Sequence, residues 1–215
     1  MTVRASSLPG SAVVTHTDWE GYLKILDALD GSHLKITYDR GVLELLSPSN
    51  LHEKVKTIIG ALVECLLEEF DRYGSGGGST TFRREHLEKG LEPDECYFLA
   101  PFEDDGDEVP APQLAIEVDV TSSSLDRMGI YATLGVGEVW RWETAGEGRL
   151  VVYLLTQPGV YQASAVSRVF PDVPMDVLPE YVRLGLKTHQ IKAVQQFRAW
   201  VRQTLRPEGS PPAEH

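Results

Sequence analysis

The sequence predicts an α/β or α+β fold built on a mixed central β-sheet. Segments with helical periodicity and segments with strand-like alternation follow in the order helix, hairpin, helix, several strands, helix, strands, helix. Hydrophobic residues make up 42% of the 215-residue chain, an ordinary share for a globular core. A chain of this length fits one domain. We therefore expect a single domain over residues 15–205, a flexible start at residues 1–14 and a disordered tail at residues 206–215.

The first predicted elements are a helix and a β-hairpin. Thr17 is a candidate cap for a helix that runs to about Leu29, because the apolar residues of this segment recur at helical spacing. Residues 34–47, LKITYDRGVLELLS, alternate in polarity on both sides of the turn Asp39-Arg40-Gly41, which predicts two paired strands. Glu44 lies within the second of these strands.

A long core helix is predicted next. Ser49 or Asn50 can cap its start, and Gly74 is placed to end it. His52 lies in the first turn, beside the apolar stripe that should face the core. The stripe consists of Leu51, Val55, Ile58, Leu62, Leu66 and Phe70.

The second half of the chain adds most of the strands. The connector 74–79, GSGGGS, lacks the Gly-Lys-Ser/Thr ending of a phosphate-binding loop, and we expect residues 101–112 to form an acidic surface loop. Strands are predicted in segments 80–85, 94–100, 114–120, 137–143, 149–155 and 161–164, and helices in 125–134, 178–185 and 188–205.

Charge and composition narrow the function classes. The net charge is −12 and the sequence pI is about 4.9, which argues mildly against nucleic acid as the default partner. A metal-dependent phosphodiesterase remains compatible, because such a site is itself acidic and the metal supplies the positive charge. Cys65 and Cys96 lie in apolar stretches, so we expect buried free thiols and a reducing, cytoplasmic setting. No apolar run is long enough to predict a membrane span.

Two carboxylates stand out in neighbouring predicted strands. Asp94 follows a proline and opens one strand, and Glu117 lies inside the next. If these strands pair, the two side chains converge, and Mg²⁺ prefers such oxygen ligands. The alternative is that Glu117 and Asp119 are ordinary outward residues of a half-exposed strand.

Arg127 lies in the first turn of the helix that follows the Glu117 strand. It borders the packed face of that helix and is placed to lean toward the carboxylates. The residues alone favour a different interpretation, in which Arg127 is a surface side chain paired with Asp126 or Glu143.

These segments resemble a known family. The runs PDECYF and LAIEVDVTSSSLDRMGIYATLGVGEVWRW are similar to the Uma-type restriction endonuclease family, a branch of the PD-(D/E)XK nuclease superfamily. The likeness extends through GVLELLSPSNLHEKV upstream and VVYLL downstream, and covers about residues 15–185. The resemblance implies a restriction-endonuclease-like mixed sheet flanked by helices, with an N-terminal helix and β-hairpin. It also implies a Mg²⁺- or Mn²⁺-dependent endonuclease that hydrolyses DNA phosphodiester bonds.

The resemblance assigns roles to particular residues. Asp94, Glu117 and the carbonyl of Val118 would hold the metal ion. The Lys of the family's motif is relocated in this branch to the next helix, four residues before a Tyr. That position is Arg127, before Tyr131.

Three acidic or histidine positions complete this set. Glu44 and His52 match acidic and histidine positions often found near the family's site, and this match is less specific than that of Asp94 and Glu117. Asp119 occupies the position from which the Lys was relocated.

The arginine at position 127 is a departure with chemical consequences. Arg stays charged in proteins, so Arg127 can stabilise negative charge and hold a phosphate, but it cannot act as a general base. Reduced activity is therefore an expectation. Two alternatives remain open: a non-catalytic nucleic-acid- or protein-binding module on a nuclease-derived fold, and a metal-dependent hydrolase of a smaller phosphate ester. The strand EVWRWE is compatible with the core or with a homodimer interface.

Overall fold

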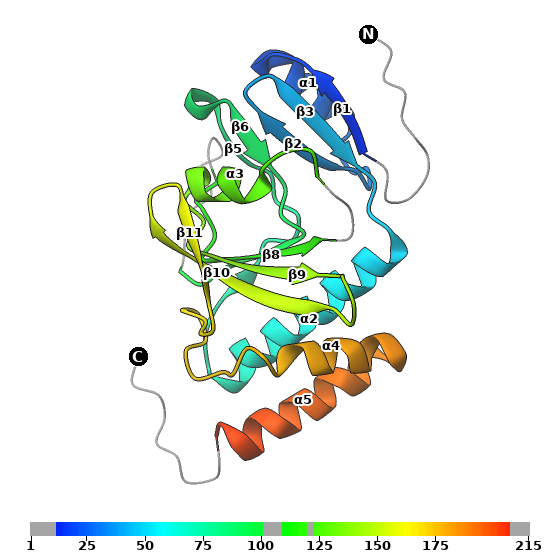
Figure 1. The fold of residues 1–215 in the computed structure, drawn as a ribbon, viewed down its shortest axis with the longest axis vertical. Coiled ribbons are helices and arrows are strands. Elements are labelled where there is room, and N and C mark those ends of the chain that lie inside the picture. The colour runs from blue at the N-terminus through cyan, green and yellow to red at the C-terminus, as the bar shows by residue number, and fades with distance from the viewer. Residues whose placement is uncertain (1–11, 101–108, 120–122, 207–215) are drawn as a thin grey trace.

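The computed structural model describes residues 12–100, 109–119 and 123–206, which form two β-sheets and five α-helices (Figure 1). The predicted mixed α/β fold is confirmed. Residues 1–11, 101–108 and 207–215 lie outside the described residues, so most of the expected flexible start, acidic loop and tail is not described.

The first sheet is antiparallel throughout, with strand order β1-β3-β2-β6-β5. Helix α1 (Trp19–Ala28) packs on it through Tyr22, whose ring stacks on Tyr38 with 4.6 Å between the ring centroids. The predicted hairpin is confirmed, and Arg40 and Gly41 in its turn both have positive φ, as a type I′ turn requires. The strands are β1 (Ala12–His16), β2 (Lys35–Asp39), β3 (Val42–Leu46), β5 (Phe82–Arg84) and β6 (Lys89–Leu91).

Two expectations about the start of the chain were wrong. Helix α1 is capped by Asp18 and not by Thr17, because the Asp18 carboxylate accepts the N–H of Gly21 at 2.9 Å. Strand β1 begins at Ala12, inside the segment expected to be a flexible start, because residues 12–16 pair with β3.

The second sheet is the predicted mixed central sheet, with strand order β11-β10-β9-β8-β7-β4. Strands β8 and β9 are parallel and are connected through α3 (Arg127–Leu134), whereas the other neighbours are antiparallel. The strands are β4 (Ser75–Gly76), β7 (Glu95–Phe98), β8 (Leu114–Asp119), β9 (Glu138–Glu143), β10 (Arg149–Gln157) and β11 (Val160–Ser164), and a single 3₁₀ turn spans Glu85–Leu87.

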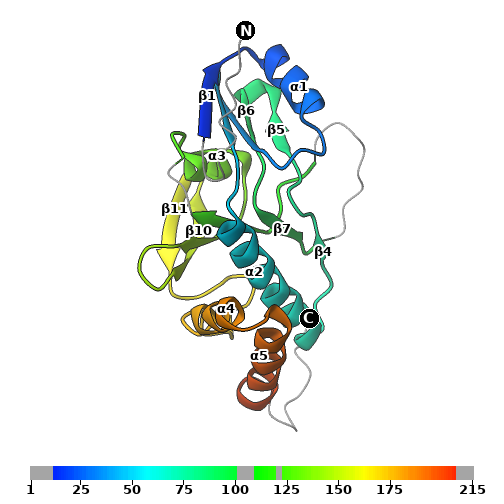
Figure 2. The same cartoon turned by 90° about the vertical axis from the view of Figure 1, so that its right-hand side faces the viewer.

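Helices cover both faces of the central sheet. Helices α2 (Asn50–Glu69), α4 (Leu178–Lys187) and α5 (Gln190–Thr204) pack together against one face (Figure 2), and α3 lies between the two sheets (Figure 1). The main core lies under α2 and includes Trp140 and Trp142 of β9, both almost fully buried. The EVWRWE strand therefore contributes to the core. A homodimer stays a prediction.

Helix α2 follows its sequence pattern only in part. Ser49 caps it as predicted, with its hydroxyl accepting the N–H of His52 at 3.2 Å. The helix ends at Glu69, well before Gly74, because the chain turns at Phe70 and Asp71, and Asp71 adopts a left-handed conformation. The first position of the predicted apolar stripe, Leu51, is exposed because the core begins one turn later.

Two further findings concern the helices and the cysteines. Of the helices in the described ranges, none is long and apolar enough to cross a membrane. Cys65 and Cys96 are buried and free, as predicted.

We predict that α2 stabilises the fold through its buried face, which includes Ile59. Ile59 is fully buried in the main core, so Ile59→Ala should lower the free energy of unfolding by about 2–5 kcal/mol. Leu51→Ala on the same helix is the control, and should change it by no more than about 0.5 kcal/mol because Leu51 is exposed. Urea unfolding followed by circular dichroism measures both, and equal losses would contradict this role of α2.

Candidate active site

Five of the predicted site residues line one cavity of about 280 Å³ between the two sheets. They are His52 at the start of α2, Asp94 just before β7, Glu117 and Val118 in β8, and Arg127 at the start of α3. We call this space the site cavity. Glu44, the sixth predicted residue, does not line it.

The pairing of β7 with β8 brings Asp94 to Glu117. Asp94 extends the hydrogen bonding between β7 and β8 by one residue, because its backbone N–H donates to the carbonyl of Ile116 at 3.2 Å. The Asp94 carboxylate then accepts the backbone N–H of Val118 at 2.6 Å. The predicted strand pairing is confirmed, and it places both carboxylates at the same cavity.

Asp94 is almost fully buried and has two cationic or potentially cationic neighbours. His52 Nε2 lies 2.9 Å from Oδ2, and Lys35 Nζ lies 3.3 Å from Oδ1. Burial alone raises the pKa of the Asp94 carboxyl, but the hydrogen bond from His52 and the charge of Lys35 hold it well below its usual range. Burial lowers the pKa of His52, and the hydrogen bond and charge of Asp94 outweigh this and raise it.

Glu117 forms a bidentate ion pair with Arg127. Arg127 Nε donates to Oε1 at 2.5 Å and Nη2 donates to Oε2 at 2.8 Å. The Tyr131 hydroxyl also donates to Oε2, at 2.7 Å. Burial and the charge of Glu117 raise the pKa of Tyr131, so this hydroxyl keeps its proton. The expectation that Arg127 pairs with Asp126 or Glu143 on the surface was therefore wrong.

Arg127 also connects the central sheet to the first sheet. Its Nη1 donates to the Thr37 hydroxyl in β2, and its Nη2 donates to the carbonyl of Glu92 at 2.8 Å. Asp126, which was considered as its partner, instead caps α3 by accepting the N–H of Gly129 at 3.0 Å.

Glu44 is buried and holds the chain that leads into α3. Its carboxylate accepts the Ser123 hydroxyl at 2.5 Å and the backbone N–H and hydroxyl of Ser124, both at 2.7 Å. Asp119 does line the site cavity, where it pairs with Arg141 at 2.6 Å.

With this geometry in place, the comparisons identify the family. Residues 19–187 match the family Uma2, described as "Putative restriction endonuclease". The chain belongs to the Uma2 family. Among solved structures, a chain from Anabaena variabilis ATCC 29413, described as a "putative nuclease belonging to DUF820", is 15% identical. The match covers 74% of this chain and 90% of that chain, with a TM-score of 0.45. No curated protein matches the chain.

Sequence reasoning missed one buried cation of this Uma2 chain. Lys35 at the start of β2 lines the site cavity and lies against Asp94. Its signal in the sequence is alternation: Lys35 and Thr37 are two residues apart, so both side chains leave the same face of β2. That face meets the carboxylates.

The carboxylates retain limited room for a metal ion. Within the described residues, no group of three or more His, Cys, Asp or Glu side chains is arranged to hold one. A carboxylate has about four acceptor positions, and Asp94 and Glu117 each have three directed at the neighbours given above. These neighbours leave about one acceptor position unused on each carboxylate, and Mg²⁺ commonly binds through one or two carboxylates and keeps its waters. The donor chemistry therefore fits, while Lys35 and Arg127 offset the negative charge that attracts a cation.

We predict that Asp94 links stability to acidic pH. Its pKa is lower in the folded chain than in the unfolded chain, so its charge stabilises the fold above the unfolded pKa of about 3.9. This contribution is lost as the pH falls from there toward the folded pKa. The free energy of unfolding, measured by urea titration at a series of pH values, should drop below about pH 4. In Asp94→Asn the free energy of unfolding should be lower at neutral pH and should change less as the pH falls below about 4. Identical pH profiles for wild type and variant would contradict the assignment.

We predict a large structural role for Arg127. Arg127→Ala leaves the mostly buried Glu117 carboxylate without its cation, and should lower the free energy of unfolding by about 3–5 kcal/mol. Arg141→Ala is the matched control, because its pair with Asp119 is one-third exposed and should contribute about 1 kcal/mol or less. Chemical unfolding at neutral pH measures both variants. Similar losses in the two would show that the Arg127–Glu117 pair behaves as a surface ion pair.

Proposed function

We propose that this chain is a nuclease that hydrolyses DNA phosphodiester bonds with Mg²⁺ or Mn²⁺ as its cofactor. The observation that carries the proposal is the convergence of Asp94, Glu117, Val118, Arg127 and His52 on one cavity. Membership of a family described as a restriction endonuclease supports the reaction class. A reducing, cytoplasmic setting is part of the proposal and is in keeping with two buried free thiols.

Asp94, Glu117 and the Val118 carbonyl are the groups that would hold the metal ion. A divalent ion held by these groups would lower the pKa of a bound water and polarise the phosphate. Arg127 contributes positive charge: of its five N–H donors, four have partners among the described residues, so one remains for a phosphate oxygen. Because Arg keeps its proton, Arg127 stabilises negative charge and does not activate water.

His52 acts on Asp94 rather than on a substrate. Its Nε2 faces Asp94 at 2.9 Å, and its Nδ1 faces Glu53 at 3.1 Å, so both ring nitrogens are engaged. A raised pKa favours the doubly protonated ring, which donates to both carboxylates. His52 therefore orients the Asp94 carboxylate, and the alternative of a water-positioning base has no free ring nitrogen to support it in this arrangement.

One observation favours a second candidate, a non-catalytic nucleic-acid- or protein-binding module. The Arg127 guanidinium already compensates Glu117 in bidentate fashion, so a metal ion must compete with a buried ion pair. A binding module would keep the fold and the cavity without metal-dependent cleavage.

The test is a cleavage assay on plasmid and single-stranded DNA with Mg²⁺ or Mn²⁺. Wild type should cleave, Glu117→Gln should lose about 10²-fold or more, and Arg127→Lys should retain or increase the rate. Glu143→Gln, on the adjacent strand β9 and outside the site cavity, should match wild type. Mn²⁺ should also raise the melting temperature of wild type more than that of Glu117→Gln.

The binding module predicts a different result. Wild type, Glu117→Gln and Arg127→Lys would then be equally inactive with every metal and substrate, and Mn²⁺ would leave their melting temperatures unchanged.

A further inference from the structure

The charged side chains that line the site cavity almost balance one another. Among the described residues, four carboxylates share this cavity with three Lys or Arg side chains and with His52. Three of the carboxylates have an ion-pair partner in the cavity. The pairs are Asp94 with Lys35, Glu117 with Arg127, and Asp119 with Arg141. A divalent ion is therefore attracted less strongly than by a cluster of unpaired carboxylates, because every nearby cation repels it.

Lys35 carries the cationic charge that lies nearest to the open side of Asp94. The Lys35 side chain is 7% exposed, and its Nζ lies 3.3 Å from Asp94 Oδ1. The other oxygen, Oδ2, accepts the backbone N–H of Val118 at 2.6 Å and lies 2.9 Å from His52 Nε2. Among these contacts Oδ1 has the fewer partners, so it is the oxygen of Asp94 with more room for a metal ion. Lys35 lies directly beside it.

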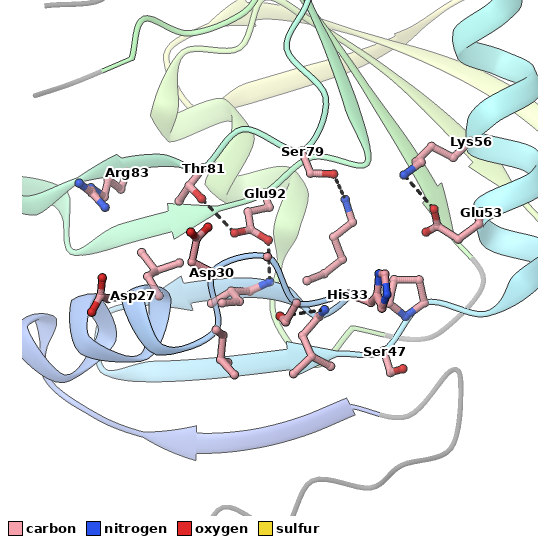
Figure 3. A pocket seen from close by; sticks show the side chains of 18 of the residues that line it. Asp27, Asp30, His33, Ser47, Glu53, Lys56, Ser79, Thr81, Arg83 and Glu92 are labelled. Atoms are coloured by element: carbon pink, nitrogen blue, oxygen red, sulfur yellow. Dashed lines mark hydrogen bonds and ion pairs between the residues drawn. The ribbon is translucent and has the colours of Figure 1, made fainter. Parts of the chain in front are cut away.

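The Lys35 ammonium is held in place and has no donor left for a substrate. It donates to the Pro93 carbonyl at 2.7 Å and to the hydroxyl of Ser79 at 2.8 Å. Ser79 lies at the wall of a separate cavity of about 1070 Å³, behind the ammonium (Figure 3). Together with Asp94, these partners use all three N–H donors of a lysine.

Lys35 can therefore act on a ligand only through its charge. An ion at about 2.1 Å from Asp94 Oδ1, the usual Mg²⁺–oxygen distance, would lie within about 5.4 Å of Nζ, because Nζ is 3.3 Å from the same oxygen. Repulsion between two cations at such a distance is strong where little water screens it. The lysine thus makes metal binding less favourable without blocking a ligand atom.

We propose that Lys35 is an internal counter-cation of Asp94 that keeps the metal affinity of the site cavity low until a phosphodiester adds its own negative charge. Lys35 is then a positioning residue and not a catalytic one; this rests on the proposed nuclease function. A phosphodiester supplies a further oxygen ligand and offsets the repulsion from Lys35 and Arg127. Metal ion and phosphodiester should therefore strengthen each other's binding by the same factor, because coupling between two ligands is reciprocal.

The test measures Mn²⁺ binding without any cleavage. Isothermal titration calorimetry compares wild type with Lys35→Met and Lys35→Gln, both of which remove the charge. Each variant should bind Mn²⁺ about tenfold or more tightly than wild type, because the repulsion is gone. A lysine that only supports the fold would give unchanged or weaker Mn²⁺ binding when it is replaced. Lys35→Gln keeps a donor for the Pro93 carbonyl, and it carries the test if Lys35→Met does not fold.

Lys89 provides the matched control. Its side chain is 12% exposed, and its Nζ pairs with Asp39 at 2.6 Å, at the other end of β2 from Lys35. Lys89 does not line the site cavity, so Lys89→Met should leave Mn²⁺ affinity unchanged. Equal affinities in wild type and the Lys35 variants, or the same gain in Lys89→Met, would overturn the proposal.

A second measurement uses wild type alone and two small esters. Dimethyl phosphate is a minimal phosphodiester with one negative charge, and trimethyl phosphate is its uncharged analogue. Dimethyl phosphate should tighten Mn²⁺ binding about fivefold or more, whereas trimethyl phosphate should leave it unchanged. Equal Mn²⁺ affinities in the two esters would contradict the proposed coupling and overturn the proposal.

These outcomes are distinguishable from a failure of the proposed function. Cleavage of DNA by wild type, combined with equal Mn²⁺ affinities in wild type and the Lys35 variants, would keep the nuclease and remove the role of Lys35. Tighter Mn²⁺ binding in the Lys35 variants without cleavage of any substrate would remove the nuclease reaction and keep Lys35 as the counter-cation of a metal site.

Discussion

Burying two carboxylates between two sheets is the constraint on which this structure depends. Asp94 is almost fully buried and the Glu117 side chain is only 13% exposed, so an unpaired carboxylate would be costly at either position. Their cations come from distant parts of the chain: Lys35 from β2 of the first sheet, and Arg127 from α3 on the central sheet. Charge compensation therefore ties the sheets together in addition to packing, and the site cavity takes its walls from both.

This constraint explains why an arginine suits position 127. One planar guanidinium reaches both oxygens of Glu117, the Thr37 hydroxyl and the Glu92 carbonyl at the same time. A lysine presents three donors from a single nitrogen and cannot span these four acceptors. Arg127 thus strengthens the junction between the sheets, and it does so with a group that cannot give up its proton. The arginine therefore adds a connection between the two sheets but cannot act as a general base.

The parts of the site that follow from local pattern were predictable, and the parts that follow from sheet packing were not. Strand alternation and the motif were enough to predict that Asp94 and Glu117 converge, because β7 and β8 are neighbours in the chain and pair directly. Lys35 was missed because its contact with Asp94 depends on how the first sheet sits against the central one. The residues alone favoured Asp126 or Glu143 as the partner of Arg127, whereas the family resemblance placed Arg127 at the site carboxylates. Side-chain direction, which the sequence pattern does not fix, selects Glu117.

The register of the β2–β3 hairpin also determines which side chains of the first sheet reach the site. Glu44 and Thr37 are directly paired across β3 and β2, so their side chains leave the same face of the first sheet. Glu44 holds Ser123 and Ser124 just before α3, and Thr37 accepts a hydrogen bond from Arg127 at the start of that helix. A slip of one strand by one residue would turn its side chain to the opposite face and separate Glu44 from Thr37. Glu44 therefore supports the site from outside the cavity, because it holds the chain just before α3 while Thr37, on the same face of the sheet, accepts a hydrogen bond from the arginine of that helix.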